Sequence, residues 1–468
     1  MATVLLIGVG PLPCYRSNTL YGFGIRTWQF LLPLLADGHK VILATLEFGQ
    51  SGDSPEILYR HDPTLWGGVV HIPMPEPNAE NRNDLVTRFG QLLREHKPVC
   101  IVSAGSTISS SLACAIPTDL PIWIDLFGDL LAEAQAKAAF AGSEQLWFFH
   151  QLYLPILRRG DAFSAVSEAQ RFATIGQLGI LGRLDHHTLG YNFAHTVPCA
   201  YDGTVSPVKQ RKVIRGHIVS HNDFVVLCSG GFNTWADIDT LFRGLDGAMT
   251  ENRRIHVVVT GGAISGHHEE GFNRFSAFIQ QSPNRDRFHL VGWVPTEDVD
   301  AYILESDLGI NADLEITETL FGSRNRFLSW IQAGLPILTT VVCELSQILH
   351  REGLCFGVPP SDPDQLKQTL LNAVQREAER RQIAQRARRY GDEHFTFEAT
   401  TKPLRQWVSS PQIAPDNKAR QESGGFLHPL DEQISDWLTG KKPSATGAKP
   451  GMRRIASLIR RLLTGETR

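Results

Sequence analysis

The stretch RFHLVGWVPTEDVDAYILESDLGINADLEITETLFGSRNRFLSWIQAGLPILTT, residues 287–340, decides the fold. Its short apolar runs alternate with helical patterns, which predicts strand, helix, strand, a long polar loop, helix and strand. The loop supplies Glu318, Ser323, Arg324 and Asn325 immediately before the second helix. Free backbone N–H groups and the positive end of the helix dipole suit a pyrophosphate at such a place. We therefore predict a nucleotide-diphosphate site there.

The same alternation of strands and helices occurs twice along the chain, with a polar, basic connection at about 202–222 between the two series. The first series of apolar runs is TVLLIGV, KVILATL, VCIVSA, PIWIDLF and DAFSAVS, and the second is DFVVLCS, RIHVVVTGG, RFHLVG, SDLGIN and LPILTT. Runs of this kind are typical of parallel sheets covered by helices on both faces. We predict an α/β protein with two doubly wound domains, residues 1–206 and 207–395, that face a cleft.

The composition is that of a soluble globular protein, with 42% hydrophobic and 20% charged residues. Neither a membrane-spanning run nor a signal peptide is recognisable, so we expect a cytoplasmic protein. Residues 440–468 carry a charge of +7, which leaves −11 on the remainder and makes nucleic acid a poor partner. No CxxC pair occurs, and reduced, buried thiols are predicted for Cys14, Cys100, Cys114, Cys199, Cys228, Cys343 and Cys355.

The segments GWVP (292–295) and GSRNRFLSWIQAGLPIL (322–338) resemble the C-terminal half of GT-B glycosyltransferases, in particular the retaining, family-four-like sugar transferases. The family's pair of glutamates, which seven residues separate, is replaced here by Phe321 and Ser329. Glu318 instead lies seven positions before Asn325, and the helix start is similar to a variant branch with a Ser-x-Asn-Arg motif. The resemblance implies the GT-B fold, with two Rossmann-like domains and a C-terminal helix that crosses back to the first.

The resemblance also implies roles for residues of the second domain. Arg324 or Arg326 would neutralise the leaving diphosphate, with Ser323 and Asn325 beside it, because a guanidinium offers paired donors to phosphate oxygens. Glu318 would hold the donor sugar, and the backbone near Val294 would read the nucleobase. The competing interpretation is a helix capped by Ser323, with arginines on the surface.

A glycine turn in the segment SGGFNTW (229–235) follows a predicted strand and precedes a helix. Gly230 and Gly231 permit close backbone approach, so N–H groups here, with Asn233, are candidate donor contacts. A tight strand-to-helix turn with no ligand is the alternative.

Candidates for the acceptor side lie in the first domain. The segment GVGPLPCYRSNTLYGFGIRTWQF (8–30) resembles the first loop of GT-B enzymes and contributes Asn18, Gly22 and Gly24. Asp125 follows a buried strand and is a candidate for orienting a hydroxyl, and His150 is a second acceptor-side candidate. Helix capping near Asp125 and a partly buried, satisfied histidine are the alternatives.

Beyond the second domain, the pattern predicts a long charged helix at about 362–390. The resemblance implies a crossover helix at 396–410. Residues 411–449 are rich in Pro, Gly, Ser and charges, which predicts a flexible linker, and residues 450–464 form a basic amphipathic pattern. That pattern fits either a helix on the inner, anionic face of a membrane or a helix docked on protein.

Taken with the resemblance, these features favour a glycosyltransferase that moves a sugar, with retention, from a nucleotide-diphosphate sugar to a hydroxyl acceptor. The acceptor is a glycan, a lipid-linked sugar or a small molecule, and surface glycan biosynthesis is one context. A nucleotide-sugar isomerase and a non-catalytic glycan- or partner-binding protein are the alternatives. We expect no cofactor and no metal, because the pairs His186–His187 and His267–His268 lack the spacing of a good zinc site.

Overall fold

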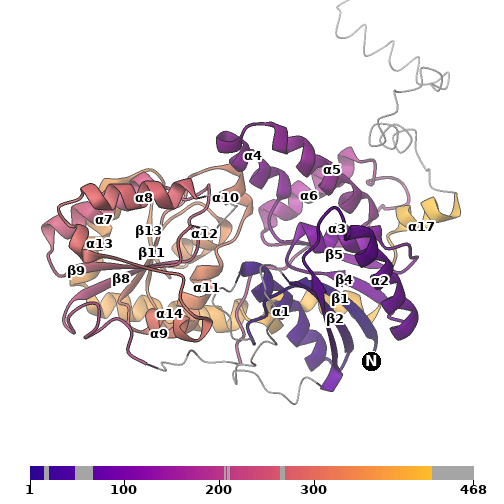
Figure 1. Cartoon of the computed structure of the whole chain (residues 1–468), viewed down its shortest axis with the longest axis horizontal. Coiled ribbons are helices and arrows are strands. Elements are labelled where there is room, and N and C mark those ends of the chain that lie inside the picture. Colours follow the sequence, from indigo (N-terminus) through magenta and orange to yellow (C-terminus); the bar gives the residue numbers. More distant parts are fainter. Residues whose placement is uncertain (15–20, 48–66, 205–206, 208–210, 264–268, 424–468) are drawn as a thin grey trace, which may run out of the picture.

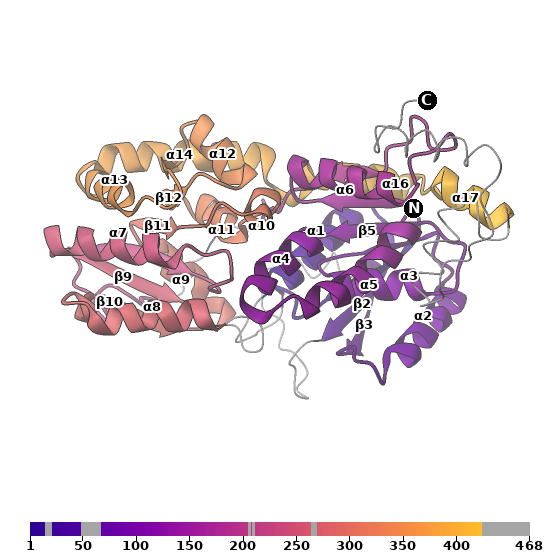
Figure 2. The same cartoon turned by 90° about the horizontal axis from the view of Figure 1, so that it is seen from above.

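The computed structural model describes residues 1–14, 21–47, 67–204, 207, 211–263 and 269–423. Two α/β domains lie side by side, and the chain returns to the first domain at its C-terminal end (Figures 1 and 2). Each domain is built on one sheet in which every strand pairing is parallel. This confirms the predicted fold class.

The first domain has a seven-stranded sheet of order β3-β2-β1-β4-β5-β6-β7. Its central strands are apolar on both faces because helices cover both sides, and β1 (TVLLIGV) is almost wholly buried. The strands are β1 (Thr3–Val9), β2 (Lys40–Glu47), β3 (Val69–Pro75), β4 (Cys100–Ser103), β5 (Ile122–Leu126), β6 (Ala162–Ala165) and β7 (Ala194–Thr196). The helices are α1 (Gly22–Ala36), α2 (Arg82–His96), α3 (Thr107–Ala115), α4 (Leu130–Ala141), α5 (Glu144–Arg159) and α6 (Glu168–Ile180).

The second domain has a six-stranded sheet of order β10-β9-β8-β11-β12-β13. The strands are β8 (Phe224–Ser229), β9 (Ile255–Thr260), β10 (Phe288–Gly292), β11 (Leu308–Asn311), β12 (Ile337–Thr340) and β13 (Phe356–Val358). The helices are α7 (Ile238–Glu251), α8 (Glu270–Gln281), α9 (Val299–Leu304), α10 (Thr317–Phe321), α11 (Asn325–Ala333), α12 (Glu344–Arg351) and α13 (Pro363–Gln375), with short 3-10 turns at Arg285–Arg287 and Thr296–Asp298. The apolar side chains of the sheet and its helices form the core.

The C-terminal part of the described chain crosses from the second domain to the first. The predicted single helix at 362–390 is two helices, because the chain breaks at Arg376 between α13 and α14 (Glu377–His394). Two short helices follow in place of one crossover helix, α15 (Phe397–Thr400) and α16 (Lys402–Ser409). Phe397, Leu404 and Val408 join the apolar core around α1. The crossover is thereby fixed to the first domain.

A last helix, α17 (Pro415–Glu422), lies inside the segment that the sequence predicts to be a linker. Its Asp416 forms an ion pair with Arg183 of the first domain, with Nε and Oδ2 2.7 Å apart and both side chains fully buried. Residues 411–422 are therefore part of the folded first domain. The remainder of the predicted linker and the amphipathic segment 450–464 lie outside the described residues. No helix in the described part of the chain is long and apolar enough to cross a bilayer.

Candidate active site

The loops that follow the carboxyl ends of strands in both sheets meet where the two domains touch, and we call this contact region the domain junction. The Ser167 hydroxyl donates to the Phe321 carbonyl across it, at 2.6 Å. The Glu344 carboxylate accepts from the Glu168 N–H at 2.8 Å, at the first turn of α6. Ligands of open parallel sheets bind at this end of the strands, so the candidate site lies here.

The predicted phosphate arginine, Arg324, points into the second domain and is 4% exposed. Its Nε donates to Asp313 Oδ2 at 2.8 Å, and its Nη2 donates to Glu318 Oε2 at 3.3 Å. Nη1 bonds the Ser323 carbonyl at 3.1 Å, so every nitrogen of the guanidinium has a protein partner. The Asp313 carboxylate already neutralises this cation, and the Glu318 carboxyl lies beside it. In the structure Arg324 therefore holds the loop together, whereas the prediction was a contact with the diphosphate.

Glu318 is the residue that Arg324 holds in place on the short helix α10. Burial raises the pKa of Glu318 to about 7, and the nearby Asp313 and Glu133 carboxylates oppose its ionisation further. The Arg324 cation lowers the pKa of Glu318, but it also binds Asp313, at shorter range. The influence of Glu133, which lies on α4 of the first domain, shows that Glu318 is close to the domain junction. Near neutral pH this carboxyl is able to carry its proton.

Arg326, two residues further along, is in the opposite situation. Its Nη2 donates to the Gly231 carbonyl at 2.9 Å, and among the described residues it forms no ion pair with a carboxylate. Burial lowers the pKa of Arg326 because its charge is poorly solvated. An added Cβ on Gly230 would lie 3.4 Å from the same Nη2, so the guanidinium packs on the glycine turn. This half-buried cation is not in an ion pair within the described chain and suits an anionic ligand.

Backbone N–H groups surround this arginine from two elements. α11 begins at Asn325, and no side chain caps its first turn. Gly230 has a φ of 93°, a conformation that favours glycine, and it directs the following residues back toward α11. Within the described chain, the N–H groups of Gly231 and Asn233 make no hydrogen bond. The glycine turn, the uncapped helix start and Arg326 together form a cradle with the chemistry of a diphosphate site.

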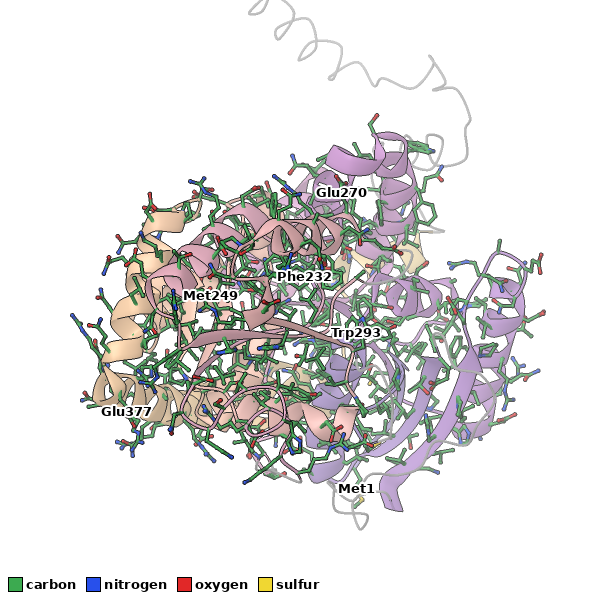
Figure 3. All side chains as sticks on the ribbon, turned by 60° about the vertical axis from the view of Figure 1, so that its left-hand side comes forward. Met1, Phe232, Met249, Glu270, Trp293 and Glu377 are labelled. Atoms are coloured by element: carbon green, nitrogen blue, oxygen red, sulfur yellow. The ribbon has the colours of Figure 1, made fainter. Side chains whose placement is uncertain are left out.

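The segment near Val294, predicted to read a base, follows edge strand β10. The Gly261 N–H donates to the Gly292 carbonyl at 2.7 Å, which joins this turn to the one after β9. Trp293 is 40% exposed, and its Nε1 donates to the Ala263 carbonyl at 3.0 Å (labelled in Figure 3). This bond orients a partly exposed indole, which sequence reasoning missed although Trp293 directly precedes Val294.

The first domain contributes the start of α1 to the domain junction. An added Cβ on Gly22 would lie 2.8 Å from the Asn325 side-chain nitrogen, so only glycine permits this close approach. Gly24 is buried within the first turn of α1. Ser323 does not cap α11, which has no side-chain cap. Asn18 lies outside the described residues.

Asp125 does not have the predicted role in orienting a hydroxyl. It is 1% exposed, and its two oxygens accept from Arg26 Nη2 at 2.8 Å and from Arg26 Nε at 3.0 Å. The Ser164 hydroxyl and the Gly105 N–H donate to the same carboxylate, at 2.7 and 3.1 Å. A carboxylate filled by four protein donors has no room for an acceptor, so Asp125 joins α1 to the strands of its own domain.

His150 is on α5, which packs against α3 and α4 of the first domain. Its Nδ1 lies 2.7 Å from the Leu146 carbonyl of the same helix, a local helix contact. The structure therefore does not bring His150 together with the loop of Glu318 and Arg326. A hollow of about 640 Å³ lies elsewhere, between the end of α1 and α16, and it is lined by charges of both signs, among them Asp37 and Lys402. It does not touch the site residues.

Comparisons with known proteins agree with this geometry. Residues 223–376 match the family model of glycosyl transferases group 1. A search of curated proteins finds no match to the sequence. Sucrose-phosphate synthase from Thermosynechococcus elongatus has a TM-score of 0.64 and 17% identity, over 87% of this chain and 98% of the other.

Two further structures were solved with nucleotide ligands. HepE of Anabaena, in complex with UDP and glucose, has a TM-score of 0.60 and 15% identity, over 88% of this chain and 100% of the other. A structure described as trehalose-6-phosphate from E. coli bound with UDP-2-fluoro glucose has a TM-score of 0.62 and 9% identity, again over 88% and 100%. At these identities the likeness establishes the fold. The second domain thus carries the match to glycosyl transferases group 1, at residues 223–376, and the whole chain has the fold of these structures.

Proposed function

We propose that the protein transfers a sugar from a nucleotide-diphosphate sugar to a hydroxyl acceptor at the domain junction. The observation that carries this proposal is Arg326, a half-buried cation without a carboxylate partner in the described chain. The N–H groups of Gly231 and Asn233, which make no hydrogen bond within the described chain, would bind the same diphosphate. Negative charge grows on the leaving diphosphate as the glycosidic bond breaks, so donors fixed in advance stabilise the transition state more than the ground state.

Glu318 is the residue that we assign to the donor sugar. Arg324 and Asp313 fix its carboxyl at the domain junction, and its raised pKa, about 7, lets it donate as well as accept a hydrogen bond near neutral pH. A protonated carboxyl also adds no negative charge beside the departing phosphate. Retention of configuration is the expectation from the resemblance to retaining transferases, with the departing phosphate oxygen taking the proton of the incoming hydroxyl.

We assign the nucleobase to the turn at Trp293 and Val294, where the exposed indole face offers a stacking surface. UDP is the first nucleotide to test, because the HepE and E. coli structures were solved with UDP or a UDP-sugar. The acceptor enters from the first domain, beside Gly22. We propose that this acceptor is a surface glycan or a glycoconjugate. We also propose that residues 450–464 contact a membrane.

The test combines binding and turnover. Thermal unfolding with UDP, GDP and TDP should show a rise in melting temperature with one of them, because a ligand that binds only the folded state stabilises it. The matching nucleotide sugar should then release free nucleotide, and NMR of the product gives its anomeric configuration. Arg326→Met should weaken nucleotide binding by about 10- to 100-fold, the equivalent of one charge-assisted contact.

The matched control is Arg285→Met, which removes an exposed arginine of the same domain. It should leave nucleotide binding unchanged. If no nucleotide raises the melting temperature, or if Arg326→Met binds as well as the unmodified protein, the proposed diphosphate cradle is wrong.

A further inference from the structure

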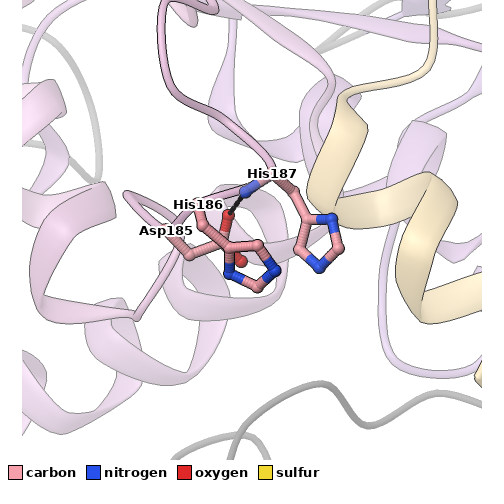
Figure 4. A group of neighbouring side chains, drawn as sticks. All are labelled: Asp185, His186 and His187. Carbon is pink, nitrogen blue, oxygen red and sulfur yellow. Dashed lines mark hydrogen bonds between the residues drawn. The ribbon is translucent and has the colours of Figure 1, made fainter.

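A cluster of metal-ligating side chains lies outside the candidate active site, in the turn between α6 and β7. Asp185, His186 and His187 each offer a ligand atom, and these atoms all lie within 4.8 Å of one another (Figure 4). The two imidazole rings are close together, with centroids 3.9 Å apart. Consecutive residues usually point in different directions, so the turn must bend sharply to gather three of them.

Hydrogen bonds within the turn hold this arrangement. Asp185 Oδ1 accepts from the His187 N–H at 2.8 Å and from the Thr188 N–H at 3.1 Å. The Thr188 hydroxyl in turn accepts from the Asp185 N–H at 3.0 Å. The second carboxylate oxygen, Oδ2, has no hydrogen bond with the described residues. One oxygen shapes the turn and the other remains available for a ligand.

The base of the turn is fixed on the protein interior. Arg183, two residues before Asp185, is fully buried and binds Asp416 of α17 as well as the carbonyls of Leu157 and Gly160, both at 2.6 Å. His186 and His187 are exposed, and their ring nitrogens bond no described residue. A rigid base below exposed imidazoles and an available carboxylate oxygen is an arrangement that needs little reorganisation to take an ion.

We propose that Asp185, His186 and His187 bind a late first-row divalent cation such as Zn²⁺ or Ni²⁺. Imidazole with carboxylate is the ligand class that these ions prefer in proteins. Zinc lies about 2.0–2.2 Å from such ligands, so ligand atoms on one tetrahedral ion are roughly 3.4 Å apart. The ligand atoms lie within 4.8 Å of one another, and rotation of the exposed imidazole side chains brings them to the spacing that the ion needs. Water completes the coordination shell.

The site is placed to stabilise the first domain without entering the reaction. α17, which Arg183 binds, lies at the end of the first domain away from the second domain in both views (Figures 1 and 2). An ion on Asp185, His186 and His187 therefore restrains the turn on which α17 docks, far from Glu318 and Arg326. We expect the bound ion to raise the melting temperature and to leave sugar transfer unchanged.

The experiment titrates the tag-free, chelator-treated protein with ZnCl₂ and NiCl₂ by calorimetry and repeats thermal unfolding with each ion. One site per chain is expected, with a rise in melting temperature. The variant His186→Ala/His187→Ala should weaken binding at least tenfold and abolish the rise. Asp185→Asn keeps an oxygen acceptor for the turn and removes the charge, so it should fold normally and bind more weakly.

The matched control is His217→Ala/His221→Ala, which removes two exposed histidines from the second domain. It should bind and be stabilised like the unmodified protein, which excludes binding to exposed histidines in general. Equal affinity in the His186→Ala/His187→Ala variant, or no binding by the unmodified protein, overturns the proposal. A double variant that melts early without any ion leaves Asp185→Asn as the deciding variant.

Discussion

At the scale of single residues, two arginines that are two positions apart have opposite environments. Arg324 lies between Asp313 and Glu318, whereas Arg326 forms no ion pair with a carboxylate of the described chain. The sequence shows two arginines at the start of a predicted helix, but it does not show which of them is buried in the second domain. The orientation depends on Asp313, which lies eleven residues before Arg324 in the loop after β11 and has no motif of its own.

This contrast predicts different consequences of the same substitution. Arg324→Met leaves two buried carboxylates without a counter-charge, and it should lower the free energy of unfolding by about 3–5 kcal/mol. Arg326→Met removes one hydrogen bond to a carbonyl and should cost only about 1 kcal/mol. Urea denaturation of both variants measures the difference. A stable Arg324→Met variant that no longer binds nucleotide would show instead that Arg324 binds the diphosphate.

Glu318 should give the protein a pH-dependent stability. Its pKa rises from 4.5 to about 7 on folding, so the folded state keeps a proton that the unfolded chain loses. Below about pH 4.5 Glu318 leaves the free energy of unfolding unchanged, because it is protonated in both states. As the pH rises from 4.5 to 7, Glu318 lowers the free energy of unfolding, and above pH 7 this loss is complete. Glu318→Gln should therefore be more stable than the unmodified protein at pH 8, by on the order of 2 kcal/mol.

Unfolding of Glu318→Gln and of the unmodified protein at pH 5 and pH 8 checks this sign. The stability gap should be smaller at pH 5, where most of the penalty is absent. Equal gaps at the two values would mean that Glu318 is ionised in the folded state. The variant should also transfer sugar more slowly, because an amide does not reproduce the proton of the carboxyl.

At the scale of elements, the strands that the sequence predicts are the ones that both faces of a sheet bury, together with the edge strand β10. The apolar runs of β1, β2, β8 and β9 are unmistakable because helices cover them on both sides. The edge strands β3, β7 and β13 were not predicted, since they are short or half-exposed and carry mixed residues. Pattern reasoning detects burial, and these three strands have too little of it.

α17 shows the same limit in a helix. The residues that it buries are Asp416, Asn417 and Arg420, so no apolar periodicity marks the buried face. Its stability depends on polar partners that are more than two hundred residues away in the chain, such as Arg183. A polar composition predicts a linker when those partners are unknown.

The buried ion pair makes α17 sensitive to one charge. Asp416→Asn would leave Arg183 and Arg420 buried together without their shared carboxylate, and it should lower the free energy of unfolding by about 3 kcal/mol or more. Lys418→Ala, on the exposed side of the same helix, should change stability by no more than about 0.5 kcal/mol. Thermal unfolding compares the two variants. Equal melting temperatures would show that the docking of α17 does not contribute to the fold.

At the scale of the whole molecule, the two domains are joined by loops that also form the candidate active site. The resemblance predicted the two-domain architecture and the return of the chain, whereas the contacts across the domain junction were not predictable. Such contacts arise between residues far apart in the sequence, for example Glu344 with the N–H groups of Glu168 and Ala169. Neither partner belongs to a motif.

Glu344 gives the last prediction. Its carboxylate accepts from two N–H groups at the start of α6, at 2.8 and 3.4 Å, and adds to the cap that Ser167 provides by accepting from the Gln170 N–H. Glu344→Ala should leave each domain folded but loosen their relative orientation, because a charged acceptor at a helix start is lost. The donor cradle lies wholly on the second domain, so nucleotide affinity should stay within about twofold. Sugar transfer should fall about tenfold, since it needs groups from both domains in place.

Small-angle scattering should show a larger radius of gyration for Glu344→Ala in the absence of nucleotide. Glu352→Ala, at the exposed end of the same helix, is the matched control and should retain the dimensions and turnover of the unmodified protein. Parallel losses of nucleotide affinity and turnover would contradict the assignment, because they would place Glu344 in the donor site. An unchanged radius with unchanged turnover would mean that other contacts, such as Ser167 with Phe321, suffice to hold the domains together.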